Sequence, residues 1–263
     1  MCGRFAQVIK HDQLKKMIDE LNIRNNDEQL EINYNVAPTQ AIGAVMYKRD
    51  ERFLTFFRWG LIPSWSKEPS TQYSMINVRA ESILEKKTFK NALLRRRCLI
   101  PATGFYEWRK PDKQPFFIHA AKSSVGCFPE LVEGRSREKD VLATSECCST
   151  SPKAASACCS TDFDLLYFAG ITEYWTGADG SYIQSAAIIT TAANEMMQPI
   201  HDRMPVILPP DVWESWLTDS FQDPASLQAM LKPCPNDILT AYPISRLVNT
   251  VNFNSEECYK PLA

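Results

Sequence analysis

The sequence of 263 residues contains no apolar run that approaches the roughly 18 residues a membrane-spanning helix requires. Its first residues lack the basic stretch and apolar core of a secretory signal peptide. The formal net charge is only −2, so there is no overall positive field of the kind that attracts nucleic acid. These absences argue against contact with a membrane and predict a cytoplasmic protein in which any basic binding surface is local.

A disulfide-stabilised fold is also disfavoured. The nine cysteines are an odd number in a chain without a signal peptide, which favours reduced thiols. Four of them form two adjacent pairs, Cys147-Cys148 and Cys158-Cys159, in a stretch rich in Ser, Thr and Ala without apolar periodicity. We interpret residues 127–162 as an inserted low-complexity loop. Zinc motifs usually separate paired cysteines by about two to four residues, so we expect no metal ion there and no metal or other cofactor elsewhere.

Apolar patterning predicts an α+β fold. Hydrophobic residues make up 44% of the chain, enough for a substantial core. Apolar spacing and prolines near helix starts predict helices at 11–22, 82–96, 209–217 and 223–232. Two strands are expected to form a hairpin around residues 48–52, and further strands are expected at 97–110, 115–121, 165–175, 182–191, 204–209 and 239–248. Because strands follow one another without alternating helices, we predict antiparallel sheets with peripheral helices in a single domain, residues 1–263.

The opening "MCGRF" places a cysteine directly after Met1. Removal of Met1 would leave Cys2 with an α-amine and a thiol on adjacent carbons. The amine has a reference pKa near 8, so a sizeable fraction is neutral and nucleophilic at neutral pH. Such a residue can form a Schiff base with an aldehyde and then close its thiol onto the same carbon as a thiazolidine. The alternative is a cysteine that occupies this position by chance.

Three other polar residues stand in apolar surroundings and are candidates for proton transfer. Glu107 lies between Tyr106 and Trp108, where desolvation would raise the pKa of its carboxyl group. Asn77 follows an apolar pair, and His201 precedes an expected strand. Each also has a structural interpretation: a surface strand residue, a turn residue and a loop cap, respectively. The sequence by itself does not bring the three together.

Aromatic and cationic residues form a second theme. Trp59 and Trp65 lie in "RWGLIPSW", and Arg4, Arg79 and Arg203 each neighbour a candidate catalytic residue. Base stacking combined with local cations is how proteins hold single-stranded nucleic acid without reading its sequence. Packing of the tryptophans in the core is the alternative.

Seven separated motifs occur in order from residue 2 to about residue 250: "MCGRF", "NYNVAPTQ", "RWGLIPSW", "INVRAES", "RRCLIPATGFYEW", "FAGI" and "TTAANEMMQPIHDRMPVIL". Together they resemble the motifs of the SOS-response-associated peptidase family, the abasic-site processing proteins. The resemblance implies a β-barrel-like, bifurcated sheet core with peripheral helices. It also implies a groove that takes single-stranded DNA. The segment 127–162 departs from the family pattern.

The resemblance further implies a mechanism. Cys2, freed by the protein's own removal of Met1, would form a thiazolidine crosslink with the ring-opened aldehyde of an abasic site and shield the lesion, with strand cleavage by a lyase reaction as a second activity. Asn77 would orient the cysteine and the lesion, Glu107 would transfer protons, and His201 would assist opening of the deoxyribose ring.

The same resemblance implies the DNA contacts. Phosphates would be bound by Arg4, Arg79 and Arg203, and the groove near the lesion would be lined by Pro38, Trp65 and Thr190. The protein would act as a monomer in the cytoplasm and associate with the nucleoid when bound to DNA.

Two other functions remain open on the sequence. N-terminal-nucleophile amidohydrolases also begin Met-Cys-Gly, and there the thiol attacks an amide with the α-amine as base. Their glycine-rich continuation differs, and "RWGLIPSW" and "HDRMP" have no counterpart in them. The second alternative is a non-catalytic single-strand binder in which Cys2 has no chemical role.

Overall fold

The computed structural model describes residues 2–24, 30–69, 75–121, 163–218 and 223–262. The expected insertion at 127–162, with both cysteine pairs, lies outside the described residues. None of the helices within the described ranges is long and apolar enough to cross a membrane.

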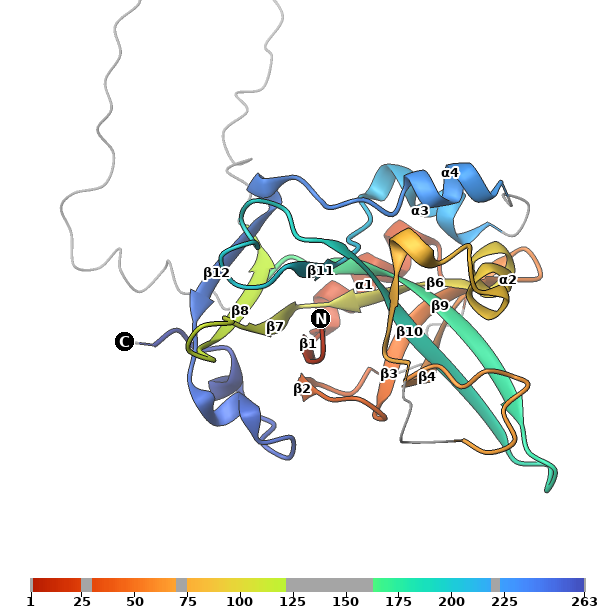
Figure 1. Cartoon of the computed structure of the whole chain (residues 1–263), viewed down its shortest axis with the longest axis horizontal. Coiled ribbons are helices and arrows are strands. Elements are labelled where there is room, and N and C mark those ends of the chain that lie inside the picture. Colours follow the sequence, from red (N-terminus) through yellow and green to blue (C-terminus); the bar gives the residue numbers. More distant parts are fainter. Residues whose placement is uncertain (1, 25–29, 70–74, 122–162, 219–222, 263) are drawn as a thin grey trace, which may run out of the picture.

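Five strands close into a barrel (Figure 1). Strand β10 pairs antiparallel with β9 on one side and parallel with β4 on the other, so the order β10-β4-β3-β6-β9 returns to its start. Their bounds are β3 (Ala41–Lys48), β4 (Glu51–Trp59), β6 (Arg97–Ala102), β9 (Leu166–Thr176) and β10 (Tyr182–Ala192). Two short strands, β5 (Asn77–Arg79) and β11 (Arg203–Pro205), pair with the far end of β10.

A second, antiparallel sheet has the order β12-β8-β7-β1-β2. The bounds are β1 (Phe5–Gln7), β2 (Asn33–Val36), β7 (Gly104–Trp108), β8 (Pro115–Ala120) and β12 (Leu239–Pro243). The single strand expected at 97–110 divides at Thr103, so that β6 belongs to the barrel and β7 to the second sheet. The Thr103 hydroxyl fixes this crossing, because it accepts from the Val8 N–H and donates to the Val8 carbonyl, each at 2.9 Å. The predicted bifurcated α+β fold is confirmed.

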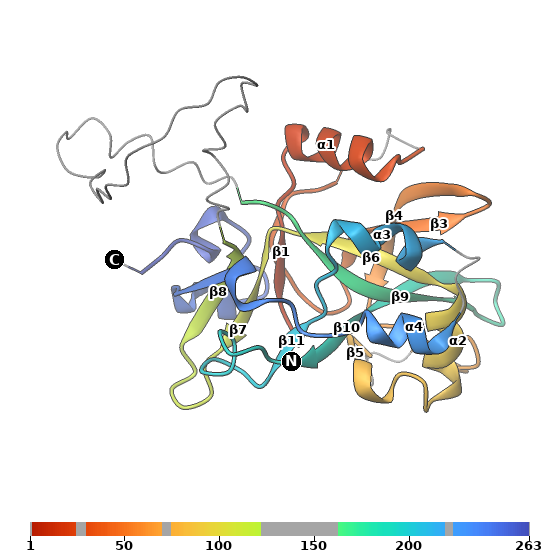
Figure 2. The ribbon, with the colours of Figure 1, turned by 90° about the horizontal axis from the view of Figure 1, so that it is seen from above.

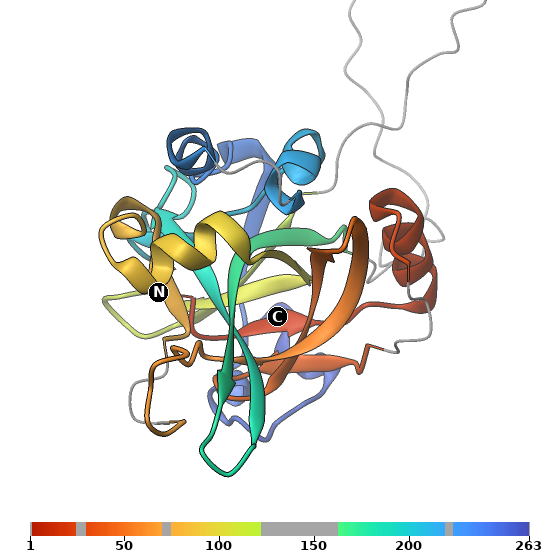
Figure 3. The same cartoon turned by 90° about the vertical axis from the view of Figure 1, so that its right-hand side faces the viewer.

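The four α-helices of the described ranges lie at the periphery of the sheets (Figure 3). They are α1 (His11–Leu21), α2 (Lys87–Arg95), α3 (Pro210–Leu217) and α4 (Pro224–Ala229), and the 3₁₀ turns are Ala80–Ser82, Asn236–Ile238, Arg246–Asn249 and Glu256–Cys258. The expected helix at 82–96 begins only at Lys87, because a 3₁₀ turn follows β5 and places Ile83 in the core. The strand expected at 204–209 is likewise shortened to β11. Beyond Pro205, the Val206 N–H donates to the Ile189 carbonyl on β10, whereas the Leu208 N–H donates to the Tyr167 carbonyl on β9.

Alternation along the barrel strands separates two cores. On β3, Ala44 packs inside the barrel with Cys98 and other residues, whereas Val45 packs outside it in a cluster that includes Leu93 of α2. The interior is tightly filled at Gly170, where an added Cβ would lie 2.6 Å from the Cys98 sulfur, so only glycine fits. The hairpin predicted around residues 48–52 is confirmed: β3 and β4 join through two residues with positive φ, Arg49 (54°) and Asp50 (63°), as a two-residue hairpin turn requires.

Candidate active site

Cys2 lies buried at the start of the chain, just before β1. The Asn77 side chain donates a hydrogen bond from Nδ2 to the Cys2 carbonyl oxygen at 2.7 Å. Asn77 is the first residue of β5, and its backbone is fixed by parallel pairing with Ile188 of β10. The N-terminal end therefore lies beside β5, β10 and β11 (Figure 2). As the sequence stands, the Cys2 nitrogen is part of the peptide bond to Met1.

Glu107 reaches the same place from the second sheet. Strand β7 pairs with β1 next to Cys2, and the Tyr106 N–H donates to the Arg4 carbonyl at 3.0 Å. Glu107 is only 2% exposed, and this burial raises the pKa of its carboxyl group from 4.5 to about 7. The direction of the shift agrees with the expectation from the sequence, and its cause is burial. Burial also raises the pKa of the Cys2 thiol well above its ordinary value, with the nearby Glu107 charge as the second cause, so the thiol is protonated.

His201 approaches Glu107 from the segment before β11, which is held on β10. Its Nε2 lies 4.0 Å from Glu107 Oε2, beyond hydrogen-bond length but close enough for a small rearrangement to bring the two together. On the other side of the ring, the Arg203 N–H donates to Nδ1 at 3.0 Å. Burial lowers the pKa of His201 below 6.5, and the Asp202 charge opposes this shift.

Two residues of this cluster were missed in the sequence. Asp202 Oδ1 lies 2.9 Å from His201 Nδ1, and its other oxygen lies 2.9 Å from Lys110 Nζ. A line of charged and polar groups therefore runs from Glu107 through His201 and Asp202 to Lys110. The signal was the acidic residue directly after the histidine in "PIHDRM", but nothing in the sequence links Lys110 to it.

The pKa of Glu107 is raised and the pKa of His201 is lowered, and these two shifts decide which group carries a proton at neutral pH. With a pKa of about 7, Glu107 is protonated in about half of the molecules at neutral pH, whereas His201 is mainly neutral. A buried carboxylic acid beside a neutral imidazole can both donate and accept a proton near pH 7. The arrangement suits a reaction with several proton transfers at one carbon.

Replacement of Glu107 should reveal this burial in the stability of the protein. Glu107→Gln is expected to be more stable than the wild type at pH 8, because the isosteric amide avoids burial of a negative charge. Since the folded-state pKa is raised, the wild type loses stability relative to the variant as pH rises from 4.5 to about 7, by up to about 3 kcal/mol. Urea unfolding of both proteins at pH 4, 6 and 8 measures the difference, and a pH-independent difference would contradict the raised pKa.

The arginines expected to bind phosphate differ in what they already contact. Arg203 forms two hydrogen bonds with the Glu81 carboxylate, at 2.6 and 3.0 Å, and a third at 2.7 Å with the carbonyl of Thr190. Arg4 Nη1 donates to Asn35 Oδ1 at 2.7 Å and to the Val248 carbonyl at 2.8 Å. Both side chains are only partly exposed. Their role in DNA binding stays a prediction.

Arg79 and Trp65 are the accessible members of the predicted DNA-binding set. Arg79 is exposed at the end of β5, where it pairs with Thr190, a residue that is itself fully buried. The Trp65 ring is 72% exposed and is oriented by a hydrogen bond from Nε1 to the Thr88 hydroxyl at 3.1 Å. Pro38 is half-buried in the turn after β2. Trp59, by contrast, is a core residue.

Among the residues that the structure describes, no group of three or more His, Cys, Asp or Glu side chains could hold a metal ion.

Comparison with known proteins places these residues in a family. The model of the SOS response associated peptidase (SRAP) family matches residues 1–251. The abasic site processing protein YoqW of Bacillus subtilis is 35% identical over 262 residues, which cover 98% of each chain, and YoaM of the same organism is 36% identical over 98% of this chain and 96% of its own. A crystal structure of a protein from Bacteroides thetaiotaomicron shares the fold with a TM-score of 0.73 at 23% identity, covering 100% of both chains.

Proposed function

The chain belongs to the SOS response associated peptidase family, and from this premise we propose that it captures abasic sites in single-stranded DNA as a covalent crosslink through Cys2. Relatives in the family are named abasic site processing proteins, and the processing of abasic sites in damaged DNA is the function of this chain. The covalent step is supported above all by the hydrogen bond from Asn77 to the Cys2 carbonyl, which holds a thiol-bearing residue near Glu107, itself 4.0 Å from His201.

The reaction begins with hydrolysis of the Met1–Cys2 peptide bond, in which water supplies the hydroxyl of the released methionine and the proton of the new amine. We assign this step to the same site, because Cys2 is buried near the carboxyl group of Glu107, whose pKa is about 7. The product carries the free amine that aldehyde capture requires.

Capture then follows in two bond-forming steps. The abasic sugar opens when its ring oxygen is protonated and its anomeric hydroxyl loses a proton, which exposes an aldehyde. The Cys2 amine adds to the aldehyde carbon and water leaves, giving an imine. The thiol adds to the same carbon, and its proton ends on the nitrogen, closing the thiazolidine. Each step moves one proton in and one out, which fits Glu107, half-protonated at neutral pH, with the neutral His201 as its partner.

Asn77 offers a further group to the substrate. Its Nδ2 is engaged by Cys2, whereas its buried Oδ1 has no hydrogen-bond partner among the residues described. A buried acceptor without a donor costs about 1–3 kcal/mol. A hydroxyl of the opened sugar or the freed amine would supply the donor, so Asn77 would bind both reactants at once.

The decisive experiment is incubation of the purified protein with single-stranded DNA that contains one abasic site, followed by a denaturing gel. A heat-stable shifted band is expected with the abasic strand and none with the intact strand. A glutaminase assay tests the amidohydrolase alternative. Release of glutamate without a crosslink would overturn the proposal in favour of the amidohydrolase, and binding with neither reaction would favour a non-catalytic binder. Shorter DNA fragments in the gel would reveal the lyase reaction.

The mature protein is expected to lack Met1, because a blocked amine can form neither an imine nor a thiazolidine. Intact-mass spectrometry of the crosslinking-competent sample measures this directly. The same measurement on Glu107→Gln and Asn77→Ala tests whether the site removes its own methionine. A fully crosslinking sample that retains Met1 would refute the mechanism.

Arg79→Ala is expected to weaken binding to single-stranded DNA about 10-fold at low salt and to reduce the slope of log affinity against log salt by about 1, as loss of one phosphate contact does. Arg79 is exposed, so the fold should be unaffected. Fluorescence anisotropy over a salt series measures both quantities. Lys15→Ala on α1 removes the same charge from an exposed position and is the control, and equal effects of the two variants would argue against a phosphate contact at Arg79.

A further inference from the structure

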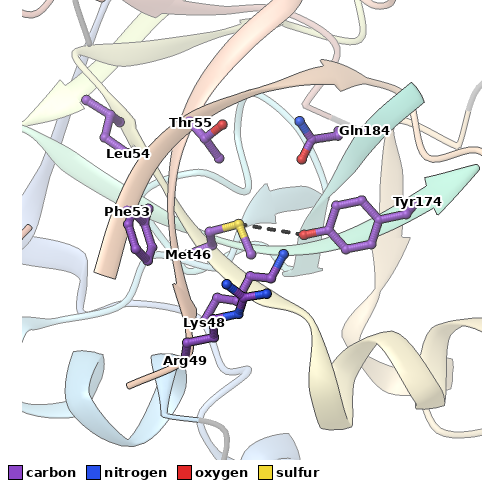
Figure 4. A pocket seen from close by; sticks show the side chains of 8 residues that line it. All are labelled: Met46, Lys48, Arg49, Phe53, Leu54, Thr55, Tyr174 and Gln184. Atoms are coloured by element: carbon purple, nitrogen blue, oxygen red, sulfur yellow. Dashed lines mark hydrogen bonds between the residues drawn. The ribbon is translucent and has the colours of Figure 1, made fainter. Parts of the chain in front are cut away.

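A separate cavity of about 350 Å³ lies at the end of the barrel where β3 and β4 join (Figure 4). Its lining comes from the β3–β4 turn and from strands β3, β4, β9 and β10. The volume lies in the lower part of the range of small-molecule sites, and mouths of β-barrels are common places for such sites. The proposed reaction of Cys2 makes no use of this cavity.

The cavity and the Cys2 site occupy different levels of the same barrel. Gln184 lines the cavity, whereas Ile188, four residues further along β10, pairs with the Asn77 that holds Cys2. At about 3.3 Å per residue, four residues of strand span about 13 Å. The barrel interior contains a packed cluster that includes Ala44 and Phe168, so the two sites are separated by protein.

The walls suit a planar aromatic group. Phe53, Met46 and Tyr174 supply apolar surface, and the Tyr174 ring is fixed by stacking on Tyr182, with centroids 6.0 Å apart and planes 9° from parallel. The Tyr174 hydroxyl donates to the Met46 sulfur at 3.6 Å, a weak acceptor that an oxygen or nitrogen of a ligand would replace. Burial raises the pKa of Tyr174 to about 12, so this hydroxyl remains a donor at physiological pH.

Polar groups add hydrogen-bonding capacity at one side. Gln184 and Thr55 lie together at the top of the view in Figure 4, across the cavity from the basic side chains. An amide presents a donor and an acceptor side by side, which matches the edge of a nucleobase.

The opposite side is cationic. Lys48 and Arg49 both line the cavity, and both are exposed. Neither has an ion-pair partner within the described part of the chain: the neighbouring Glu51 is engaged by Arg24 at 3.5 Å, and Asp50 accepts a hydrogen bond from the Tyr47 hydroxyl. Two adjacent cations without a counter-charge favour an anionic group such as phosphate.

We propose that this cavity binds one nucleotide unit, with its base against Phe53 and Tyr174 and its phosphate at Lys48 and Arg49. The shared chemistry is a nucleobase joined to a phosphate, and the source is either a free mononucleotide or a nucleotide of a single strand. The proposal does not depend on covalent capture at Cys2.

The test is calorimetric binding of adenosine monophosphate to the full-length protein, compared with adenosine, which lacks the phosphate. The double variant Lys48→Gln/Arg49→Gln is expected to bind the nucleotide about 10-fold more weakly than the wild type does, through loss of two charges facing the phosphate. The matched control is Lys15→Gln/Lys16→Gln, which makes the same change in net charge on the exposed face of α1 and should bind as the wild type does. Tyr174→Leu should weaken binding of both adenosine monophosphate and adenosine, because each presents its base to the Tyr174 ring.

A second arm, with undamaged oligothymidylate, separates the two sources. If the Lys48/Arg49 variant binds only oligothymidylate more weakly, the site takes a nucleotide of the strand. If the variant binds adenosine monophosphate more weakly, the site takes the free mononucleotide. The proposal would be overturned if the Lys48/Arg49 and Lys15/Lys16 double variants changed the affinities for adenosine monophosphate and oligothymidylate equally. It would also be overturned if the wild type bound neither of these two ligands. None of these ligands carries an aldehyde, so the outcome of the binding test is independent of the Cys2 reaction.

Discussion

Cys2→Ala is expected to lose the heat-stable crosslink to abasic DNA, to below about 1% of the wild-type yield, because no other thiol can close a five-membered ring with the α-amine. The first step should survive, since the variant retains the amine once Met1 is gone. Treatment with borohydride should therefore trap the imine, which the wild type converts to thiazolidine. Denaturing gels with and without borohydride measure both products, using variant protein whose intact mass shows that Met1 is absent.

The matched control for Cys2→Ala is Cys98→Ala. Cys98 is also a fully buried free thiol in the same core, and burial raises its pKa in the same direction. It should crosslink at the wild-type level, so any loss specific to position 2 reflects chemistry and not packing. A heat-stable adduct formed by Cys2→Ala without borohydride would exclude Cys2 as the thiol partner.

His201→Ala is expected to slow crosslinking about 100-fold while DNA affinity stays nearly unchanged, the effect typical of a lost proton-transfer group. Glu107→Gln should be slowed to a similar extent. Because Nε2 and Oε2 lie 4.0 Å apart and act on the same protons, the double variant should be much less impaired than the product of the single effects. Single-turnover crosslinking rates measure this cycle, with binding to a reduced, aldehyde-free abasic strand measured in parallel.

The pH dependence assigns the two roles. The raised pKa of Glu107 predicts that the wild-type rate changes around pH 7, and that this change disappears in Glu107→Gln. His11→Ala, an exposed histidine on α1, is the control for loss of an imidazole. Wild-type rates in His201→Ala would leave His201 as a structural residue, and loss of DNA binding together with thermal stability would show damage to the fold.

The sequence by itself determined most of the architecture and the central residue. Alternating apolar residues and turn chemistry predicted the hairpin at 48–52, and the neighbouring strand-like runs predicted the α+β class. The position of Cys2 next to Met1 is a covalent fact, so the adjacent amine and thiol that removal of Met1 would expose are predicted without a structure. A raised pKa of Glu107 was also expected from the apolar run around it, although Tyr106 and Trp108 point to the opposite face of β7 and pack in another cluster.

Only the tertiary structure decided which polar residues meet. Asn77, Glu107 and His201 come from β5, β7 and the segment before β11, and they converge because β5 and β11 both pair with β10 while β7 pairs with β1 beside Cys2. Register over such sequence separations depends on packing in three dimensions and leaves no periodic signal in the chain. The salt bridge between Lys110 and Asp202 also depends on tertiary packing, because it joins the turn after β7 to the segment before β11. The cavity does so in part, since barrel closure brings Tyr174 and Gln184 to the β3–β4 hairpin.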